Sequence, residues 1–413
     1  VVLWCLIPAS IVYIVWLFVE PMIATNIITS FMPPDVAADG GETIRSTQRI
    51  LALVSGYGVA GDVHPYEQAA AEQLSTFHNI ARLALVAIAA AAALAGALFA
   101  RSRISPTMRA RNEVEGFVKF VLIVCSVIAI LTTVGILMSV MFESIRFFSQ
   151  VSPVDFLFGT QWSPQTALRA DQVAAEGAFG AIPLFLGTLL ISAIALLVAV
   201  PVGLMSAIYL AEYAHRNVRS VAKPLLEILA GVPTVVYGFF AALTVAPFIR
   251  GVGESIGLDV ASESALAAGL VMGVMIIPFV SSISDDVITA VPQVMRDGSL
   301  GLGATKSETI RKVVFPAALP GIMGGILLAA SRAIGETMIV VMAAGLAANL
   351  TVNPLEAVTT VTVQIVTLLT GDQEFDSAKT LAAFALGLML FITTLLLNVV
   401  ALHIVKKYRE QYE

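Results

Sequence analysis

Eight separate stretches of this sequence are each long and apolar enough to cross a lipid bilayer as an α-helix. A helix needs about 20 apolar residues to cross the hydrocarbon core, and inside lipid it satisfies its own backbone N–H and C=O groups. Of the 413 residues, 58% are hydrophobic and 13% are charged, which excludes an ordinary soluble domain. The sequence therefore predicts an all-α, polytopic transmembrane helix bundle, with spans at about 1–20, 79–100, 117–142, 181–211, 224–249, 264–288, 319–347 and 379–405.

Lysine and arginine are distributed unevenly between the two sets of connecting loops. One set contains 15 of these residues and the opposing set contains 5. Because basic loops remain in the cytoplasm, the richer set is predicted to be cytoplasmic, and both chain termini are predicted to lie there too. The richer set consists of residues 101–119, 212–223, 291–316 and 406–413.

A ninth span would reverse the orientation of the C-terminus. The segment Pro354–Leu369 is largely apolar, but it is short and contains Glu356, Gln364 and several threonines. Its length and polarity favour an interfacial or re-entrant helix over a ninth span.

Two ionisable residues, Arg332 and Glu336, lie near the middle of the apolar segment Leu319–Leu346. An arginine at the bilayer centre costs about 2.5–3.5 kcal/mol, so such residues usually face a protein interior or a transport pathway. On one continuous helix, Gly325, Ala329, Arg332 and Glu336 would share a face. Two interpretations follow: the pair contacts a substrate, or it is an i,i+4 ion pair that holds neighbouring helices together.

The predicted cytoplasmic loop 291–316 contains signals for two short helices. Glycines at 298, 301 and 303 are expected to separate them, and Thr305 with Glu308 has the spacing of a capping box that begins the second. Pro316 and Pro320 are expected to end that helix before the membrane. Ile310, Val313 and Val314 would then offer an apolar side for docking, although an ordinary amphipathic connector is equally consistent with the pattern.

The same loop resembles the coupling motif of ABC-importer permeases, in which E-A-A, a glycine, an isoleucine and L-P follow at set spacings. The spacings agree, although the first triplet is degenerate. The matching positions are Asp297, Gly298 and Ser299 for E-A-A, Gly303 for the glycine, Val313 for the isoleucine, and Phe315 and Pro316 for L-P. The resemblance implies that these residues contact an ATP-hydrolysing subunit and transmit its closure to the membrane helices.

Five further segments resemble phosphate-uptake permeases of the PstC type. They are Phe156–Pro164, Phe179–Thr188, Leu226–Gly238, Ile276–Ser284 and Ser331–Thr337. The resemblance covers about 117–405 and implies a type I ABC-importer permease domain over 117–413. Residues 1–116, with two spans and an outer loop, resemble an extension found in some members.

That resemblance implies a role for Arg332 and Glu336 in phosphate passage. A guanidinium can bind a tetrahedral oxyanion through two hydrogen bonds. An ionised Glu336 could accept the O–H of protonated phosphate, which sulfate lacks, and this is our hypothesis for selectivity. The remaining alternatives are a permease for sulfate or molybdate, an ion-coupled carrier or channel, and an intramembrane enzyme, for which no catalytic constellation is visible.

The implied assembly supplies what this chain lacks. It has a second permease of the PstA type, two ATPase subunits of the PstB type that bind ATP and Mg²⁺, and a periplasmic phosphate-binding protein of the PstS type. The chain itself is expected to hold no cofactor or metal, to perform no catalysis, to contact membrane lipid and not nucleic acid, and to reside in the bacterial cytoplasmic (inner) membrane. Gly301–Ser307 resembles a phosphate-binding loop, but Thr305 replaces its second glycine and no strand precedes it.

Overall fold

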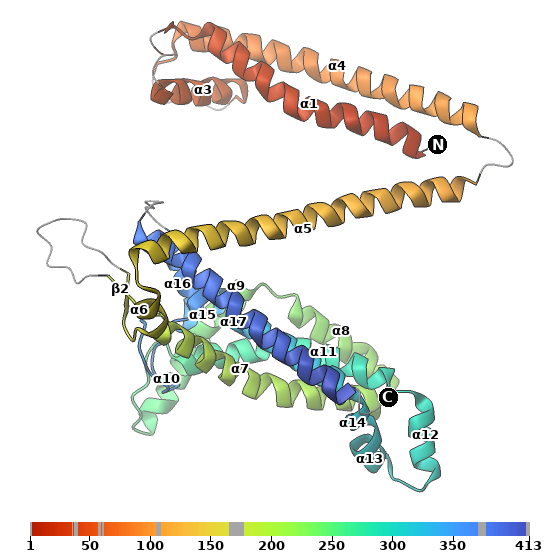
Figure 1. The fold of residues 1–413 in the computed structure, drawn as a ribbon, viewed down its shortest axis with the longest axis vertical. Helices are drawn as coiled ribbons and strands as arrows, with labels where there is room; N and C mark the ends of the chain where they lie inside the picture. Colours follow the sequence, from red (N-terminus) through yellow and green to blue (C-terminus); the bar gives the residue numbers. More distant parts are fainter. Residues whose placement is uncertain are drawn as a thin grey trace, which may run out of the picture. The chain divides into compact units, whose positions relative to one another are not determined.

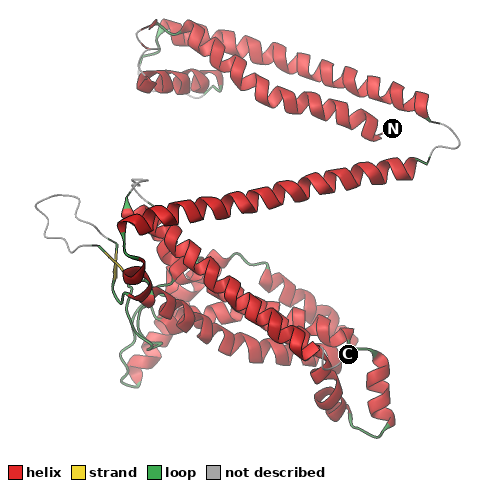
Figure 2. Cartoon of the chain, viewed as in Figure 1, coloured by secondary structure: helices red, strands yellow, loops and turns green. Residues whose placement is uncertain are grey.

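The computed structural model describes residues 2–409 except 35, 37–39, 57–58, 60–61, 105–108, 165–176 and 371–376. Helices make up nearly all of the described chain (Figure 2). The strands are β1 (Trp162–Ser163) and β2 (Ala178–Phe179), which pair antiparallel. The all-α prediction is confirmed. The chain divides into two compact units, Val1–Ile130 and Leu131–Glu413.

The N-terminal unit is a helical hairpin with a third helix against it (Figure 1). Its elements are α1 (Val2–Phe31), α3 (Gly40–Val54), α4 (Pro65–Arg103) and the first part of α5 (Ala110–Gln150). Its small core includes Ile28, Ile50 and Leu74. Helix α5 continues into the second unit, so the domain boundary predicted at 116/117 falls inside a helix and stays a prediction.

The second unit begins with α6 (Pro153–Phe158) and the two strands, and then forms a helical bundle. At one end of that bundle in Figure 1 lie α6, α10 and β2, and at the other lie α12 and α13. The bundle consists, in chain order, of α7 (Ile182–Ile208), η1 (Tyr209–Tyr213), α8 (Arg216–Ala230), α9 (Thr234–Phe240), η2 (Ala241–Val245), α10 (Ala246–Ser255), α11 (Ala265–Ala290), α12 (Gln293–Gly301), α13 (Lys306–Thr309), η3 (Ile310–Val314), α14 (Phe315–Ile334), α15 (Met338–Ala343), α16 (Val361–Leu369) and α17 (Ala378–Arg409).

Eight helical segments of the described chain are long and apolar enough to cross a membrane, as predicted. The predicted span at 224–249 is placed wrongly. Residues 224–230 belong to the separate helix α8, and the span itself is Thr234–Ser255. The cause is local, because the turn at 231–233 interrupts a run that is apolar on both sides.

Small residues let the central helices of the second unit approach closely. A Cβ at Gly273 would lie 2.9 Å from the Ala195 carbonyl oxygen on α7, and one at Gly321 would lie 2.5 Å from Val287 Cγ1 on α11. Gly269 and Gly325 also face a neighbouring helix at such distances.

The predicted single span over 319–347 is wrong. The helix starts earlier, at Lys306, and ends at Ile334. A turn at 335–337 follows, and α15 begins at Met338. The segment that could have been a ninth span contains only the nine-residue helix α16, which is too short to cross a bilayer and is partly buried.

Candidate functional site

Arg332 lies in the last turn of α14, where this helix contacts α17. The neighbouring Ser331 Oγ donates to Asn398 Oδ1 at 2.9 Å, which fixes the end of α14 against α17. The Arg332 side chain is exposed on the surface of this chain, and within the described residues it makes no ion pair or hydrogen bond. Its positive charge complements the partial negative charge at the C-terminal end of α14.

Glu336 lies in the turn after α14 and caps the next helix. Its Oε1 accepts hydrogen bonds from the backbone N–H groups of Met338 at 3.1 Å and Ile339 at 3.5 Å. Its main-chain oxygen accepts from Thr362 Oγ1 at 2.9 Å, which ties the turn to α16. The turn between α14 and α15 is therefore held by side-chain contacts on both sides.

The expected shared helix face of Gly325, Ala329, Arg332 and Glu336 is wrong for Glu336, because α14 ends two residues before it. No ion pair joins Arg332 to Glu336 within the described chain. The i,i+4 ion pair is therefore not formed in this structure. Each charge instead complements the end of a different helix.

Buried hydrogen bonds hold the segment around α16 in place. Thr188 Oγ1 on α7 accepts from the Val361 N–H at 3.1 Å, and Trp162 Nε1 donates to Gln364 Oε1 at 2.9 Å. Gln364 Nε2 also donates to the Leu346 carbonyl at 3.2 Å. Gln364, read from the sequence only as a polar interruption, binds this segment to β1, and the Val361 backbone N–H binds it to α7.

The predicted coupling loop forms a helical hairpin at one end of the bundle. Thr305 and Glu308 form the predicted capping box, with the Glu308 N–H donating to Thr305 Oγ1 at 3.3 Å and the Thr305 N–H donating to Glu308 Oε2 at 3.0 Å. Gly303 makes the turn with a φ of +88°, in the region that favours glycine. Gly298 does not break the helix as expected, because it lies inside α12, which ends at Gly301.

The apolar residues expected to dock a partner lie on the side of this hairpin that faces the helical bundle, so this expectation is wrong. Ile310 and Val314 are buried against the bundle, and Val313 is half-buried. The exposed apolar side chains are instead those of α12 and the turn, with Val294 80% and Leu302 92% exposed. Pro316 and Pro320 do not end the helix, which continues to Ile334.

The motif positions of the loop differ in exposure. Asp297, Gly298 and Gly303 are exposed, whereas Val313, Phe315 and Pro316 are half-buried. Ser299 turns toward the second helix, and its Oγ lies 3.0 Å from Thr309 Oγ1.

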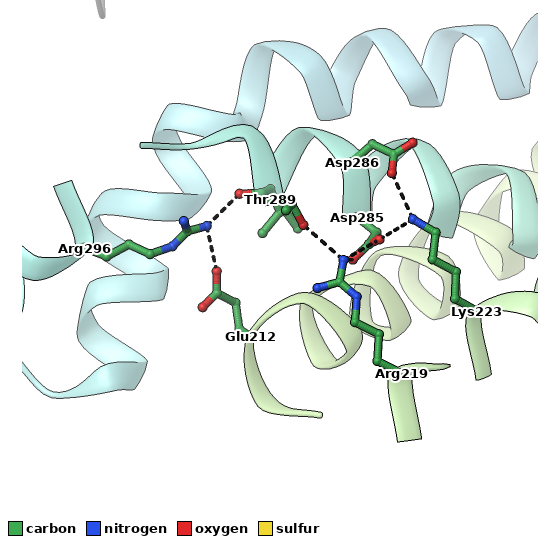
Figure 3. Close-up of polar contacts among 8 residues, drawn as sticks. Glu212, Arg219, Lys223, Asp285, Asp286, Thr289 and Arg296 are labelled. Carbon is green, nitrogen blue, oxygen red and sulfur yellow. Dashed lines mark hydrogen bonds and ion pairs between the residues drawn. The ribbon is translucent and has the colours of Figure 1, made fainter. Parts of the chain in front are cut away.

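Two clusters of charged residues lie where α11 meets α8 and α12 (Figure 3). Asp285, which is 2% exposed, accepts from Arg219 Nη2 at 2.9 Å and from Lys223 Nζ at 2.8 Å. Lys223 also contacts Asp286 at 3.0 Å. The ion pairs of Asp285 therefore join α8 to α11.

Hydrogen bonding to Asp285 raises the pKa of Lys223 above its ordinary value, and Asp286 adds to this effect. A lysine is charged at physiological pH even at its ordinary pKa, and the raised pKa of Lys223 extends the charged range to higher pH.

Arg296 on α12 forms the second cluster, and it was not among the residues predicted to be functional. Its Nη2 donates to Glu212 Oε1 at 3.0 Å and to the Ile288 carbonyl at 2.7 Å, and its Nη1 donates to the Val291 carbonyl at 2.7 Å. The only available signal was a basic residue directly before the coupling triplet.

Contacts continue from this end of the bundle toward Glu336. Tyr237 on α9 donates to the Leu229 carbonyl near the end of α8 at 2.8 Å. A Cβ at the adjacent Gly238 would lie 2.8 Å from Met342 Sδ on α15. Helix α9 thus contacts α15, which Glu336 caps, and α8, which pairs with Asp285. Among the described residues, no group of three or more His, Cys, Asp or Glu residues is arranged to bind a metal.

Both parts of the chain match known family models. Residues 199–410, just over half of the sequence, match the binding-protein-dependent transport system inner membrane component. Residues 1–132 match a family described as phosphate ATP-binding cassette transporter.

Individual transport proteins are also similar to this chain in sequence. A probable ABC transporter permease of Bacillus subtilis is 32% identical over 70% of this chain and 89% of its own length. The phosphate transport system permease protein PstC of Mesorhizobium japonicum is 34% identical over 60% of this chain and 76% of its own length.

A bacterial alginate ABC transporter shares the fold, with a TM-score of 0.51 and 14% identity over 72% of this chain and 97% of the other. The predicted permease fold and the family resemblance of the sequence motifs are thereby confirmed. The chain belongs to the family of binding-protein-dependent transport system inner membrane components, as a multi-pass permease subunit of an ABC transporter.

Proposed function

We propose that this chain is a transmembrane subunit of an ATP-driven importer that moves inorganic phosphate across the bacterial cytoplasmic membrane. The observation that carries the proposal is that two separate comparisons point to phosphate transporters. Residues 1–132 match the phosphate transporter family, and a PstC permease is similar to this chain over 60% of its length. Residues 1–116 would be the N-terminal extension and 117–413 the permease domain.

Arg332 is our candidate for the phosphate contact. Its guanidinium is exposed and has no partner within the described chain, so both of its hydrogen-bonding edges are free to bind an oxyanion. An unpaired arginine facing lipid would be costly. We therefore assign this surface to a pathway between the chain and a second, PstA-type permease.

Glu336 is our candidate for selecting protonated phosphate. Oε1 is occupied by the N–H groups of α15, whereas Oε2 has no hydrogen bond within the described residues. A carboxylate held in this way can accept the O–H of phosphate through Oε2, and it would repel fully ionised sulfate.

The hairpin at 291–316 is our candidate for the ATPase contact. Its exposed motif positions Asp297, Gly298 and Gly303 lie beside the apolar side chains Val294 and Leu302, which supports docking into a groove of a PstB-type subunit. Ser299, Val313, Phe315 and Pro316 would support that surface from the bundle side. The two PstB-type subunits would bind ATP and Mg²⁺, and a PstS-type protein would deliver phosphate. Both chain termini would be cytoplasmic.

The test is uptake of labelled phosphate and of labelled sulfate by vesicles that contain the purified complex, with its binding protein outside and ATP inside. We expect ATP-dependent phosphate uptake that excess sulfate does not inhibit. Uptake of sulfate or molybdate in preference to phosphate would contradict the assigned substrate. Phosphate uptake that persists without ATP would indicate an ion-coupled carrier.

A further inference from the structure

Arg296 connects the candidate ATPase-docking helix to the end of a membrane-spanning helix. The last four carbonyls of a helix lack the usual partner within that helix. Arg296 donates to one of these in α11, that of Ile288, and to the carbonyl of the C-cap residue Val291, both at 2.7 Å. A planar guanidinium can make both bonds at once, whereas a lysine ammonium lacks the fixed fork.

The same guanidinium also connects α12 to the end of a second spanning helix. Its Nη2 lies 3.0 Å from Glu212 Oε1, and Glu212 lies in η1, directly after α7. The side chains are 14% and 11% exposed, respectively. Burial reduces solvent screening of this ion pair, so separating the charges is more costly than at the surface. One side chain thus joins α12, α11 and the end of α7.

Arg296 and the candidate docking residues point to different sides of the same short helix. Asp297 follows directly in the chain and is exposed, whereas the Arg296 side chain is largely buried. Arg296 points from α12 toward Glu212 (Figure 3). A partner that moves the exposed side of α12 must therefore move the Arg296 contacts or break them. The cleft next to Arg296 has a volume of about 520 Å³ and is also lined by Lys306 and Gln293.

We infer that Arg296 is a positioning residue that transmits displacement of α12 to α7 and α11 together, with Glu212 as its acceptor. The inference rests on the proposed function, because it assumes that an ATPase subunit displaces α12. Arg296 need not touch ATP, phosphate or the ATPase. Its loss should therefore separate ATP hydrolysis from transport and should leave assembly of the complex intact.

The experiment compares Arg296→Gln, Arg296→Lys and Glu212→Gln in the full complex in vesicles. Phosphate uptake and ATP hydrolysis are measured together, with and without binding protein. We expect the phosphate moved per ATP hydrolysed to fall about five- to tenfold in Arg296→Gln. This ratio should fall less in Arg296→Lys and in Glu212→Gln. Arg111→Gln is the control, since it removes an arginine from an exposed i,i+4 pair with Glu115 in the N-terminal unit.

A purely structural role would lower the yield of complex or its melting temperature and would leave the phosphate-to-ATP ratio of the assembled fraction unchanged. That result would overturn the inference. If the complex with Arg296→Gln does not assemble, the Glu212→Gln variant tests the inference instead, because it retains both hydrogen bonds from Arg296 to backbone carbonyls. An unchanged ratio in Glu212→Gln would then reject Glu212 as the acceptor and the inference with it. Failure of the proposed function shows separately, as a wild-type complex that does not take up phosphate.

Discussion

The Glu336 carboxylate accepts a hydrogen bond from the backbone N–H of Met338 at 3.1 Å, and so caps the helix that follows it. This contact separates two charges that the sequence places at helical spacing. Arg332 remains on the preceding helix without a partner in the described chain. The pair therefore offers one free cation and one anchored anion, an arrangement suited to contact a substrate that is both an anion and a hydrogen-bond donor.

Replacing Arg332 should impair transport and leave stability unchanged. Arg332→Gln is expected to lower phosphate uptake by about tenfold or more, equivalent to losing roughly 1.4 kcal/mol or more of interaction. Arg332→Lys keeps the charge, loses the fork and should be intermediate. Vesicle uptake and the melting temperature of the purified complex would be measured together. Phosphate uptake at the wild-type rate by Arg332→Lys would contradict a two-hydrogen-bond contact between Arg332 and phosphate.

Substitutions at Glu336 should separate its capping role from its role in selectivity. Glu336→Ala removes the cap of α15 and is expected to destabilise this region by about 1 kcal/mol. Glu336→Gln can still accept the backbone hydrogen bonds but removes the negative charge, so we expect it to weaken the preference for phosphate over sulfate. Competition uptake assays measure that preference. If Glu336→Gln discriminates as well as the wild type, the selectivity hypothesis fails.

Two neighbouring glycines of α14 provide a matched test of helix packing. A Cβ at Gly321 would lie 2.5 Å from Val287 Cγ1, whereas a Cβ at Gly324 would meet nothing within 4 Å. Gly321→Ala should therefore destabilise the protein by about 1–3 kcal/mol through overpacking, and Gly324→Ala should not. Thermal unfolding in detergent distinguishes them. Equal melting temperatures would show that α11 and α14 can move apart at no cost.

The adjacent aspartates of α11 should respond very differently to loss of charge. Asp285 is 2% exposed and pairs with Arg219 and Lys223, whereas the Asp286 side chain is 67% exposed. Asp285→Asn is expected to cost roughly 1–3 kcal/mol, less than a fully buried ion pair because both cations reach solvent. Asp286→Asn should change little. A comparable loss in both variants would contradict the ion-pair connection between α8 and α11.

The Lys223 ion pairs should produce a loss of stability in alkaline solution. Hydrogen bonding to Asp285, and then to Asp286, raises the pKa of Lys223 in the folded protein above its ordinary 10.5. The stabilisation is therefore complete below pH 10.5 and disappears as the pH rises through the folded-state pKa. Melting temperatures between pH 9 and 12 should fall more steeply in wild type than in Lys223→Met. Parallel curves would show that Lys223 does not contribute.

The number of spans, the capping box at Thr305 and the turn at Gly303 could all be predicted from the sequence. Each depends on residues that are close together in the chain: an apolar run long enough for the bilayer, a side chain that reaches its own helix end, and a residue that adopts positive φ. The break after Ile334 could not be predicted in this way, because the residues on both sides of it are apolar. Hydrogen bonds from α15 and α16 to Glu336 stabilise that break.

What the sequence determined by itself is a membrane bundle of eight spans with a helical hairpin in one loop, since these features follow from local hydrophobicity and backbone preference. The tertiary structure alone decided which charges pair between different helices. Arg296 pairs with Glu212, 84 residues away in the chain, and Arg219 pairs with Asp285, 66 residues away. Arg332 and Glu336 are four residues apart and form no ion pair within the described chain. The physical reason is that an ion pair depends on distance and burial in the folded chain, and spacing along one helix predicts that distance only while the helix continues.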